Sequence, residues 1–222
     1  MVRGRASVPS VEWWVSKAGS DGLKQPVPPR RRQCVAATLA VLALLPLAAC
    51  GGGPSDTFDL LAATDLAGSS RARGQLVVLE PAATSPADSD RIVVHPTPNT
   101  VATLKGAQWP ENLPRLLQTR LIQSFENSRL LARVARPGEG IEANAQLATE
   151  IRRFDIDIAT GQAVVEISAK LVSTGSGRVL AAKVFSASEP GDAKDGAGAA
   201  RALNAAFASV ARDMVSWTAV RF

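Results

Sequence analysis

The strongest constraint on this chain is the apolar segment at residues 34–50, because it decides how much of the sequence remains to fold. Three arginines, at residues 30–32, stand directly before it, and its last four residues read LAAC. A basic start, an apolar middle and small residues ahead of a cleavage point are typical of a secretory leader. The pattern therefore predicts that residues 1–49 are a signal peptide.

The LAAC sequence that ends at Cys50 resembles the lipobox of bacterial lipoproteins. In those proteins a peptidase cuts before the cysteine, which then carries acyl chains such as palmitate. The resemblance implies that Cys50 is the lipidation site and that residues 50–57 form a flexible tether between the membrane and the folded part. A signal anchor or a buried helix is the alternative, but Pro46 interrupts the run and three glycines follow it at residues 51–53.

Residues 1–29 are unusual for a leader, because a signal peptide normally begins close to its basic cluster. This stretch contains Trp13 and Trp14. A mis-assigned start codon would explain it, with Val27 or Leu23 as the true first residue. A genuine extension without a separate function is the other interpretation.

Removal of the leader also changes the charge of the protein. The 222-residue chain has a net charge of +5, which would favour binding to nucleic acid or to anionic membranes. Residues 1–49 hold seven basic and two acidic residues, so they account for the whole excess. The remaining chain has no net charge and suits one domain, at residues 58–222. A nucleic-acid partner is therefore not expected.

Cysteine and histidine are too scarce for a disulfide or a metal centre. Cys34 would leave with the leader and Cys50 would be acylated, which leaves no pair for a disulfide. His95 is the only histidine, whereas structural zinc needs four cysteine or histidine ligands. We expect no metal and no cofactor, so stability must come from packing.

Hydrophobic periodicity divides the domain into short strands, one helix, three longer strands and a last helix. The short strands are predicted at residues 58–61, 75–79, 91–95, 100–108 and 130–134. The first helix is predicted within residues 110–128, starting by Pro114, since a proline deeper inside would break it. Its apolar stripe is Leu113, Leu116, Leu117, Leu121 and Phe125, and Arg115, Gln118, Gln123 and Glu126 are expected in solvent.

Residues 144–188 read as a three-stranded antiparallel meander. The inward parity of its first strand changes across Arg152 and Arg153, which predicts a β-bulge there. The last helix is predicted at residues 199–218, with a stripe that is expected to pack in the core: Leu203, Phe207, Val210, Met214 and Trp217. The fold class is therefore α+β, a two-layer sandwich of a mainly antiparallel sheet with two principal helices packed on it.

Few residues could carry catalysis. His95 ends an apolar run and no nucleophile elbow occurs in the chain, so a triad is not expected. Asp155 and Asp157 could form a carboxylate pair, but their alternation with Phe154, Ile156 and Ile158 favours a solvated face. Three arginines after the first helix could contact lipid headgroups or an acidic partner, or could simply be solvated: Arg129, Arg133 and Arg136.

Residues 91–128 carry a resemblance to a known family. The run from Trp109 through Pro110 and Glu111 into the first helix is similar to that of the ABC-type transport auxiliary lipoproteins, the partners of MCE-type and paraquat-inducible lipid transport systems. The resemblance covers residues 47–220. Members often begin with a tyrosine-rich strand, whereas this chain has no tyrosine and offers Phe58. The resemblance implies a periplasm-facing α/β domain that docks onto transport machinery.

The sequence thus predicts a non-catalytic scaffold that binds MCE-family or ABC transporter subunits and is held in a membrane through Cys50. Gly51 follows the cysteine, rather than the aspartate that signals inner-membrane retention, so the outer membrane is favoured. A lipid or small-molecule carrier with an apolar pocket is the alternative, and a periplasmic hydrolase is a third class. Trp109 is a candidate partner contact, with core packing as the other interpretation, and a homo-oligomer is left open.

Overall fold

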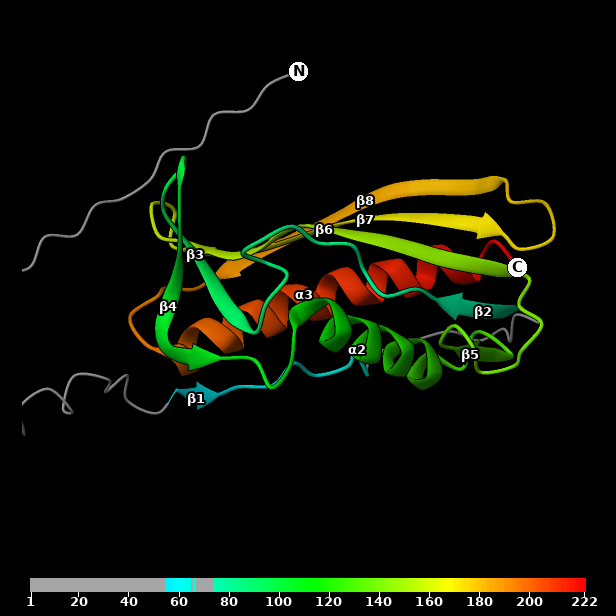
Figure 1. The fold of residues 1–222 in the computed structure, drawn as a ribbon, viewed down its shortest axis with the longest axis horizontal. Helices are drawn as coiled ribbons and strands as arrows, with labels where there is room; N and C mark the ends of the chain where they lie inside the picture. The colour runs from blue at the N-terminus through cyan, green and yellow to red at the C-terminus, as the bar shows by residue number, and fades with distance from the viewer. Residues whose placement is uncertain (1–54, 65, 67–73) are drawn as a thin grey trace, which may run out of the picture. The chain divides into compact units, whose positions relative to one another are not determined.

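The computed structural model describes residues 55–64, 66 and 74–222, which all lie in one compact unit, Gly52–Phe222. These residues form an α+β fold, as predicted: a mixed sheet of eight strands with two helices packed on one face (Figure 1). Cys50 and the leader lie outside the described residues, so lipidation and cleavage stay predictions.

Strand β6 (Ala145–Asp157) is the central element of the sheet. Along one edge it pairs antiparallel with β7 (Gln162–Ser173), which pairs in turn with β8 (Val179–Pro190). Along its other edge it pairs in parallel, first with β2 (Gln75–Val78) and then with β3 (Arg91–Thr97). The predicted meander is confirmed, and β6 joins it to the rest of the sheet.

The remaining strands extend the sheet beyond β2 and β3. Strand β4 (Thr100–Gln108) forms a hairpin with β3 and pairs in parallel with β1 (Asp56–Thr57), while β5 (Arg133–Ala135) pairs in parallel with β2. The long ladders are antiparallel and the short ones parallel. The sheet is therefore more mixed than the predicted, mainly antiparallel one.

Two predicted strands are wrong or displaced. Residues 58–61 form no strand: Phe58 N–H still donates to the Gln108 carbonyl of β4 at 2.9 Å, but Leu60 N–H donates to Asp59 Oδ1 and Leu61 N–H to Asn204 Oδ1, at 2.8 and 2.9 Å. Leu60 is nevertheless buried. The strand predicted at residues 130–134 is shorter and later, since only β5 pairs there.

Helix α2 (Leu113–Ser128) begins where the prolines allow and ends at Arg129, which has a φ of 55°. Its predicted apolar stripe is buried. Gln118 was expected in solvent, which is wrong, because its side-chain amide donates to the Val78 carbonyl at 2.9 Å and is buried. This bond ties α2 to β2.

Helix α3 (Gly196–Ala219) lies under β7 and β8 (Figure 1). Asp195 caps its start by accepting a hydrogen bond from Gly198 N–H at 2.6 Å. The predicted stripe packs in the core, with Trp217 at its partly buried end. The Phe154 ring contacts the rings of both Trp109 and Phe207, with centroid distances of 6.0 Å to Trp109 and 6.4 Å to Phe207.

The predicted bulge is confirmed. Ile151 lies opposite Ile167 and Arg153 opposite Glu166, so Arg152 has no partner residue in β7. Phe154 and Ile156 point into the core as expected, whereas Ile158 is exposed, because β6 ends one residue earlier. Neither helix in the described part of the chain is long and apolar enough to cross a membrane.

Candidate functional site

Ionisable side chains gather on the outer face of the sheet, opposite the helices, where β3 runs beside the second half of β6. His95 comes from β3, and Arg153, Asp155 and Asp157 come from β6. The parallel register places His95 opposite Asp157 and Val93 opposite Asp155. We call these four residues the β3–β6 clamp.

Arg153 holds the clamp together. Its guanidinium donates two hydrogen bonds to the Asp155 carboxylate, from Nη2 at 2.7 Å and from Nε at 3.2 Å, and Nη2 lies 3.7 Å from Asp157 Oδ2. Asp155 is only 2% exposed. The hydrogen bonds with Asp155, with the nearby charges of Asp157 and Glu166, raise the pKa of Arg153 above its ordinary value. A bidentate arginine is the partner that a buried carboxylate needs.

Asp157 and His95 complete the clamp. The backbone N–H of Thr160 donates to Asp157 Oδ1, which lowers the pKa of Asp157 below its ordinary value, and Arg153 adds to the shift. His95 Nε2 lies 3.8 Å from Asp155 Oδ2, beyond hydrogen-bond distance. With Pro98 and Arg152, the four residues line an open hollow of about 380 Å³.

The clamp corrects the expectation on the exposure of Asp155 and bears on the expectation on catalysis. Asp155 and Asp157 were expected on a solvated face, which is wrong for Asp155, because it lies between β3 and β7 in the sheet, is bonded to Arg153 and is only 2% exposed. The residues that line the hollow include no serine, cysteine or threonine that could act as a nucleophile. The Asp155 carboxylate is already bonded to Arg153 of the same strand, and His95 of β3 approaches it only to 3.8 Å.

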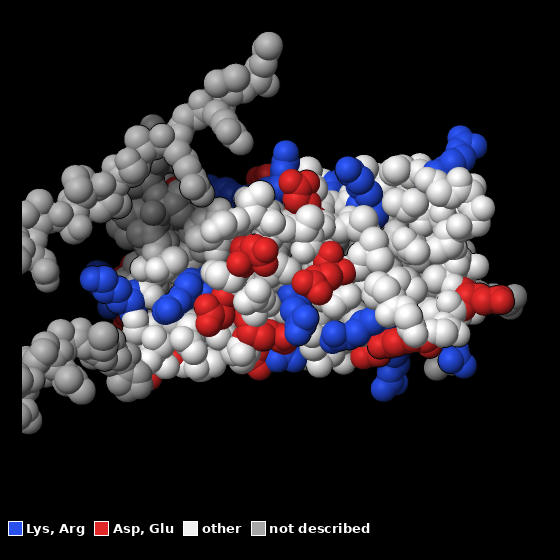
Figure 2. Space-filling view, in the orientation of Figure 1, with Lys and Arg blue, Asp and Glu red and all other residues white. Residues whose placement is uncertain are grey.

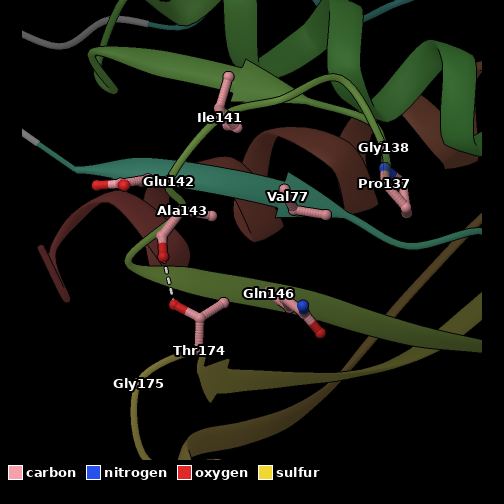
Figure 3. A pocket seen from close by; sticks show the side chains of 9 residues that line it. All are labelled: Val77, Pro137, Gly138, Ile141, Glu142, Ala143, Gln146, Thr174 and Gly175. Carbon is pink, nitrogen blue, oxygen red and sulfur yellow. Dashed lines mark hydrogen bonds between the residues drawn. The ribbon is translucent and has the colours of Figure 1, made fainter.

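A second hollow, of about 510 Å³, lies where the loop at residues 137–143 passes over β2 and β6 (Figure 3). Val77 and Gln146, paired across the two strands, form its floor, and Ile141 comes from the loop. Thr174, in the turn after β7, donates a hydrogen bond to the Ala143 carbonyl and fixes the end of the loop. Sequence analysis did not identify this hollow, since its residues share no motif.

The candidate partner residues fall in different environments. Trp109 is 1% exposed and lies in the core, so its side chain is not on the surface. Arg129 and Arg133 are exposed. Arg136 is partly buried, and its guanidinium donates to Thr119 Oγ1 at 2.8 Å. The exposed pair is therefore more accessible to a partner than Arg136.

The face of the molecule seen in Figure 2 carries no block of like charge. Acidic and basic side chains are interleaved over the face seen in Figure 2, with an uncharged area near the turn between β7 and β8. Within residues 55–64, 66 and 74–222, no three histidine, cysteine, aspartate or glutamate side chains are grouped as a metal site would require.

Comparison with known proteins identifies the family. The model of the ABC-type transport auxiliary lipoprotein component family matches residues 58–215. The chain belongs to this family. The match begins at Phe58 and ends within α3, so it includes α2, most of α3 and every strand except β1.

One curated relative is similar to this chain over much of its length. An uncharacterized protein of Bradyrhizobium diazoefficiens is 32% identical over 173 residues, which are 76% of this chain and 46% of that protein. The chain thus spans about half the length of this curated relative.

Solved structures share the fold. The crystal structure of a Xanthomonas campestris protein, XCC0632, is 30% identical, covers 76% of this chain and 94% of its own, and superposes with a TM-score of 0.65. A second crystal structure, of an uncharacterized protein, has a TM-score of 0.60 at 11% identity and covers 75% of this chain and 99% of its own, so it supports the fold alone.

Proposed function

We propose that this protein is a periplasm-facing lipoprotein that serves as a non-catalytic auxiliary component of an MCE-type ABC system moving lipids between membranes. The observation that carries the proposal is the family match over residues 58–215. Acyl chains on Cys50 hold it in the outer membrane in this proposal, since Gly51 follows the cysteine. Several acyl chains anchor a protein firmly, at about 0.8 kcal/mol per buried CH₂ group.

The clamp supports a non-catalytic role. A general base must be free to take a proton from a substrate, and a nucleophile must lie within reach of it. Asp155 instead accepts both of its hydrogen bonds from Arg153. His95 faces the same carboxylate at 3.8 Å, and the hollow beside it is lined by charged groups already engaged with one another. The carboxylates of Asp155 and Asp157 are thus engaged by Arg153 within β6.

The packing between the layers favours a scaffold over a lipid carrier. A carrier needs an apolar cavity for acyl chains. The space between the sheet and α3 is filled by Trp109, Phe154 and Phe207, which contact one another. The hollow in Figure 3 is open and has Glu142 and Gln146 in its lining. It suits a small polar group better than a lipid tail.

Co-purification tests the proposal. The full chain, expressed in its own bacterium and solubilised in detergent, should co-purify an MCE protein or a transporter subunit. Replacing the exposed Arg129 and Arg133 with glutamate tests whether they contact that partner, and Arg178, exposed in the turn after β7, replaced in the same way is the matched control. If the unaltered protein co-purifies no MCE protein and no transporter subunit, the scaffold role is contradicted.

Two further measurements separate the parts of the proposal. Cys50→Ala should block processing or release the protein from the outer-membrane fraction, and normal cleavage with normal fractionation would contradict the lipobox. Native mass spectrometry of the detergent-exchanged protein should show no bound lipid. A stoichiometric lipid would favour the carrier instead.

A further inference from the structure

Strand β8 leaves a long edge of the sheet open. In the described part of the chain it pairs with β7 alone and is twelve residues long, whereas the strands at the opposite edges, β1 and β5, have two and three residues. Proteins normally protect such an edge with charges, prolines or bulges, because its free N–H and C=O groups can pair with another strand. In β8 the bulge falls at Leu180 and the proline is Pro190. Both lie at the ends of the strand, so neither protects its middle.

The side chains between those ends do little to block the edge. Lys183 and Glu189 are the only charged residues of β8, and both lie on the helix-facing side, opposite Ala169 and Ala163 of β7. The outward side carries Val184, which is 44% exposed, and two serines. The middle of β8 therefore offers free N–H and C=O groups beside small or apolar side chains. Lys183 lies before this stretch and Glu189 after it.

We propose that β8 pairs antiparallel with β8 of a second copy of this chain, about a two-fold axis at Ser186. An antiparallel pair centred on Ser186 places Lys183 opposite Glu189 of the second copy, and the symmetry repeats this contact with the charges exchanged. Each pair joins opposite charges on the same face of the sheet, which stabilises cross-strand pairing. Phe185 then lies opposite Ala187, and Val184 opposite Ser188.

The chemistry of the edge favours a second copy as the occupant. The pattern of one lysine and one glutamate, placed symmetrically about Ser186, is self-complementary, as a two-fold interface requires. Because the axis is perpendicular to the sheet, both helix layers lie on one side and the two sheets continue into each other. A strand from a transport subunit is the competing occupant, and the experiments below distinguish it.

A disulfide tests the position of the axis. Residues directly opposite in an antiparallel pair have Cα atoms about 4.5 to 5.5 Å apart, which suits a disulfide. Ser186→Cys in the full chain, purified in detergent and oxidised, should therefore give a covalent dimer. Ser168→Cys is the matched control, because Ser168 lies on β7, away from the edge. Equal crosslinking of the two variants, or none at Ser186, would overturn the proposal.

Charge reversal tests the partner of each residue. Lys183→Glu or Glu189→Lys places like charges opposite each other twice in each dimer and should raise the dissociation constant about tenfold, as measured by analytical ultracentrifugation. The double variant restores both pairs and should return the constant to that of the unaltered protein. A monomer at all concentrations, or a double variant as weak as the single ones, would exclude this interface. Crosslinking of Ser186→Cys to a transport subunit would assign the edge to that subunit instead.

Discussion

The two halves of β6, which meet at Arg152, have similar inner faces and different outer faces. In the first half, residues 145–151, burial alternates, and the outward residues include the exposed Glu150. In the second half, three consecutive residues are buried: Phe154, Asp155 and Ile156. Phe154 and Ile156 belong to the core that α3 covers, as do the inward residues of the first half. Asp155 is buried on the other side.

The difference comes from the neighbouring strands. The first half has β2 beside it over three residues and then Ala82 beside Glu150, and Glu150 stays exposed on its outer face. The second half lies beside β3, whose hairpin with β4 continues past it and contributes Pro98 to the hollow. A polar group enclosed there must be satisfied by a partner, and Arg153 supplies it. The burial pattern of a strand therefore depends on its neighbours as much as on its own alternation.

The largest difference in stability should be between two single-residue deletions in β6, one of the bulge residue Arg152 and one of Glu150 before it. Deleting Arg152 removes the residue without a partner, so Arg153 follows Ile151 and regular alternation continues; we expect a loss of about 1 kcal/mol, mainly from the bend and the Arg152–Glu166 ion pair at 3.2 Å. Deleting Glu150 turns Ile151 outward and Arg152 into the core, which should prevent folding. Circular dichroism and urea titration of both variants measure this. Similar stability of the two would contradict the bulge assignment.

Neutralising one carboxylate in each half should have the next largest effect. Asp155→Asn removes the charge that Arg153 binds, and we expect a loss of about 2 kcal/mol in the free energy of unfolding, less than for a fully buried pair because Arg153 is partly exposed. Glu150→Gln is the matched control and should change stability by less than about 0.5 kcal/mol, since the residue is exposed. Urea denaturation at pH 7 measures both. Equal losses would show that the two outer faces do not differ.

The first half of β6 also contains a buried polar group that should be replaceable. Thr149 points inward and is buried, and its hydroxyl has no hydrogen-bond partner among the described residues. Thr149→Val keeps the shape and removes the unpaired hydroxyl, so we expect a gain of about 1 kcal/mol. Thr149→Ser, which keeps the hydroxyl and removes the methyl group, is the control and should be destabilising. A loss of stability in the valine variant would mean that the hydroxyl is bonded in solution.

Much of the fold could be predicted because the sequence carries local patterns. The stripes of α2 and α3 recur at helical spacing, the meander alternates, and the parity change at Arg152 located the bulge. The failures involve contacts between distant segments. Gln118 is buried through a bond to β2, forty residues away, and Leu60 and Leu61 bond to side chains, including Asn204. Periodicity contains no information on such pairs.

The same limit applies to the candidate sites. His95, Asp155 and Asp157 could be noted one by one as chemically capable residues. Their grouping depends on the parallel pairing of β3 with β6, which joins segments about sixty residues apart and has no sequence signal. Arg153 was read only as part of the bulge, although it is the residue that satisfies Asp155. The hollow in Figure 3 depends on how one loop lies over two strands, and its residue types are ordinary.

The smallest effect, a dependence on pH, should come from Asp157 at the end of the second half. Its folded-state pKa is lowered, chiefly by the Thr160 N–H, so its carboxylate adds stability above the unfolded pKa of about 3.9, and this is lost as the pH falls through the lower folded pKa. The unaltered protein should therefore be more stable than Asp157→Asn at pH 7, and the difference should shrink as the pH falls below the unfolded pKa. Urea midpoints of both proteins measured from pH 7 to pH 2.5 test this. A difference that stays constant over this range would mean that the variant acts through packing or the turn, because only a titrating carboxylate ties the loss to pH.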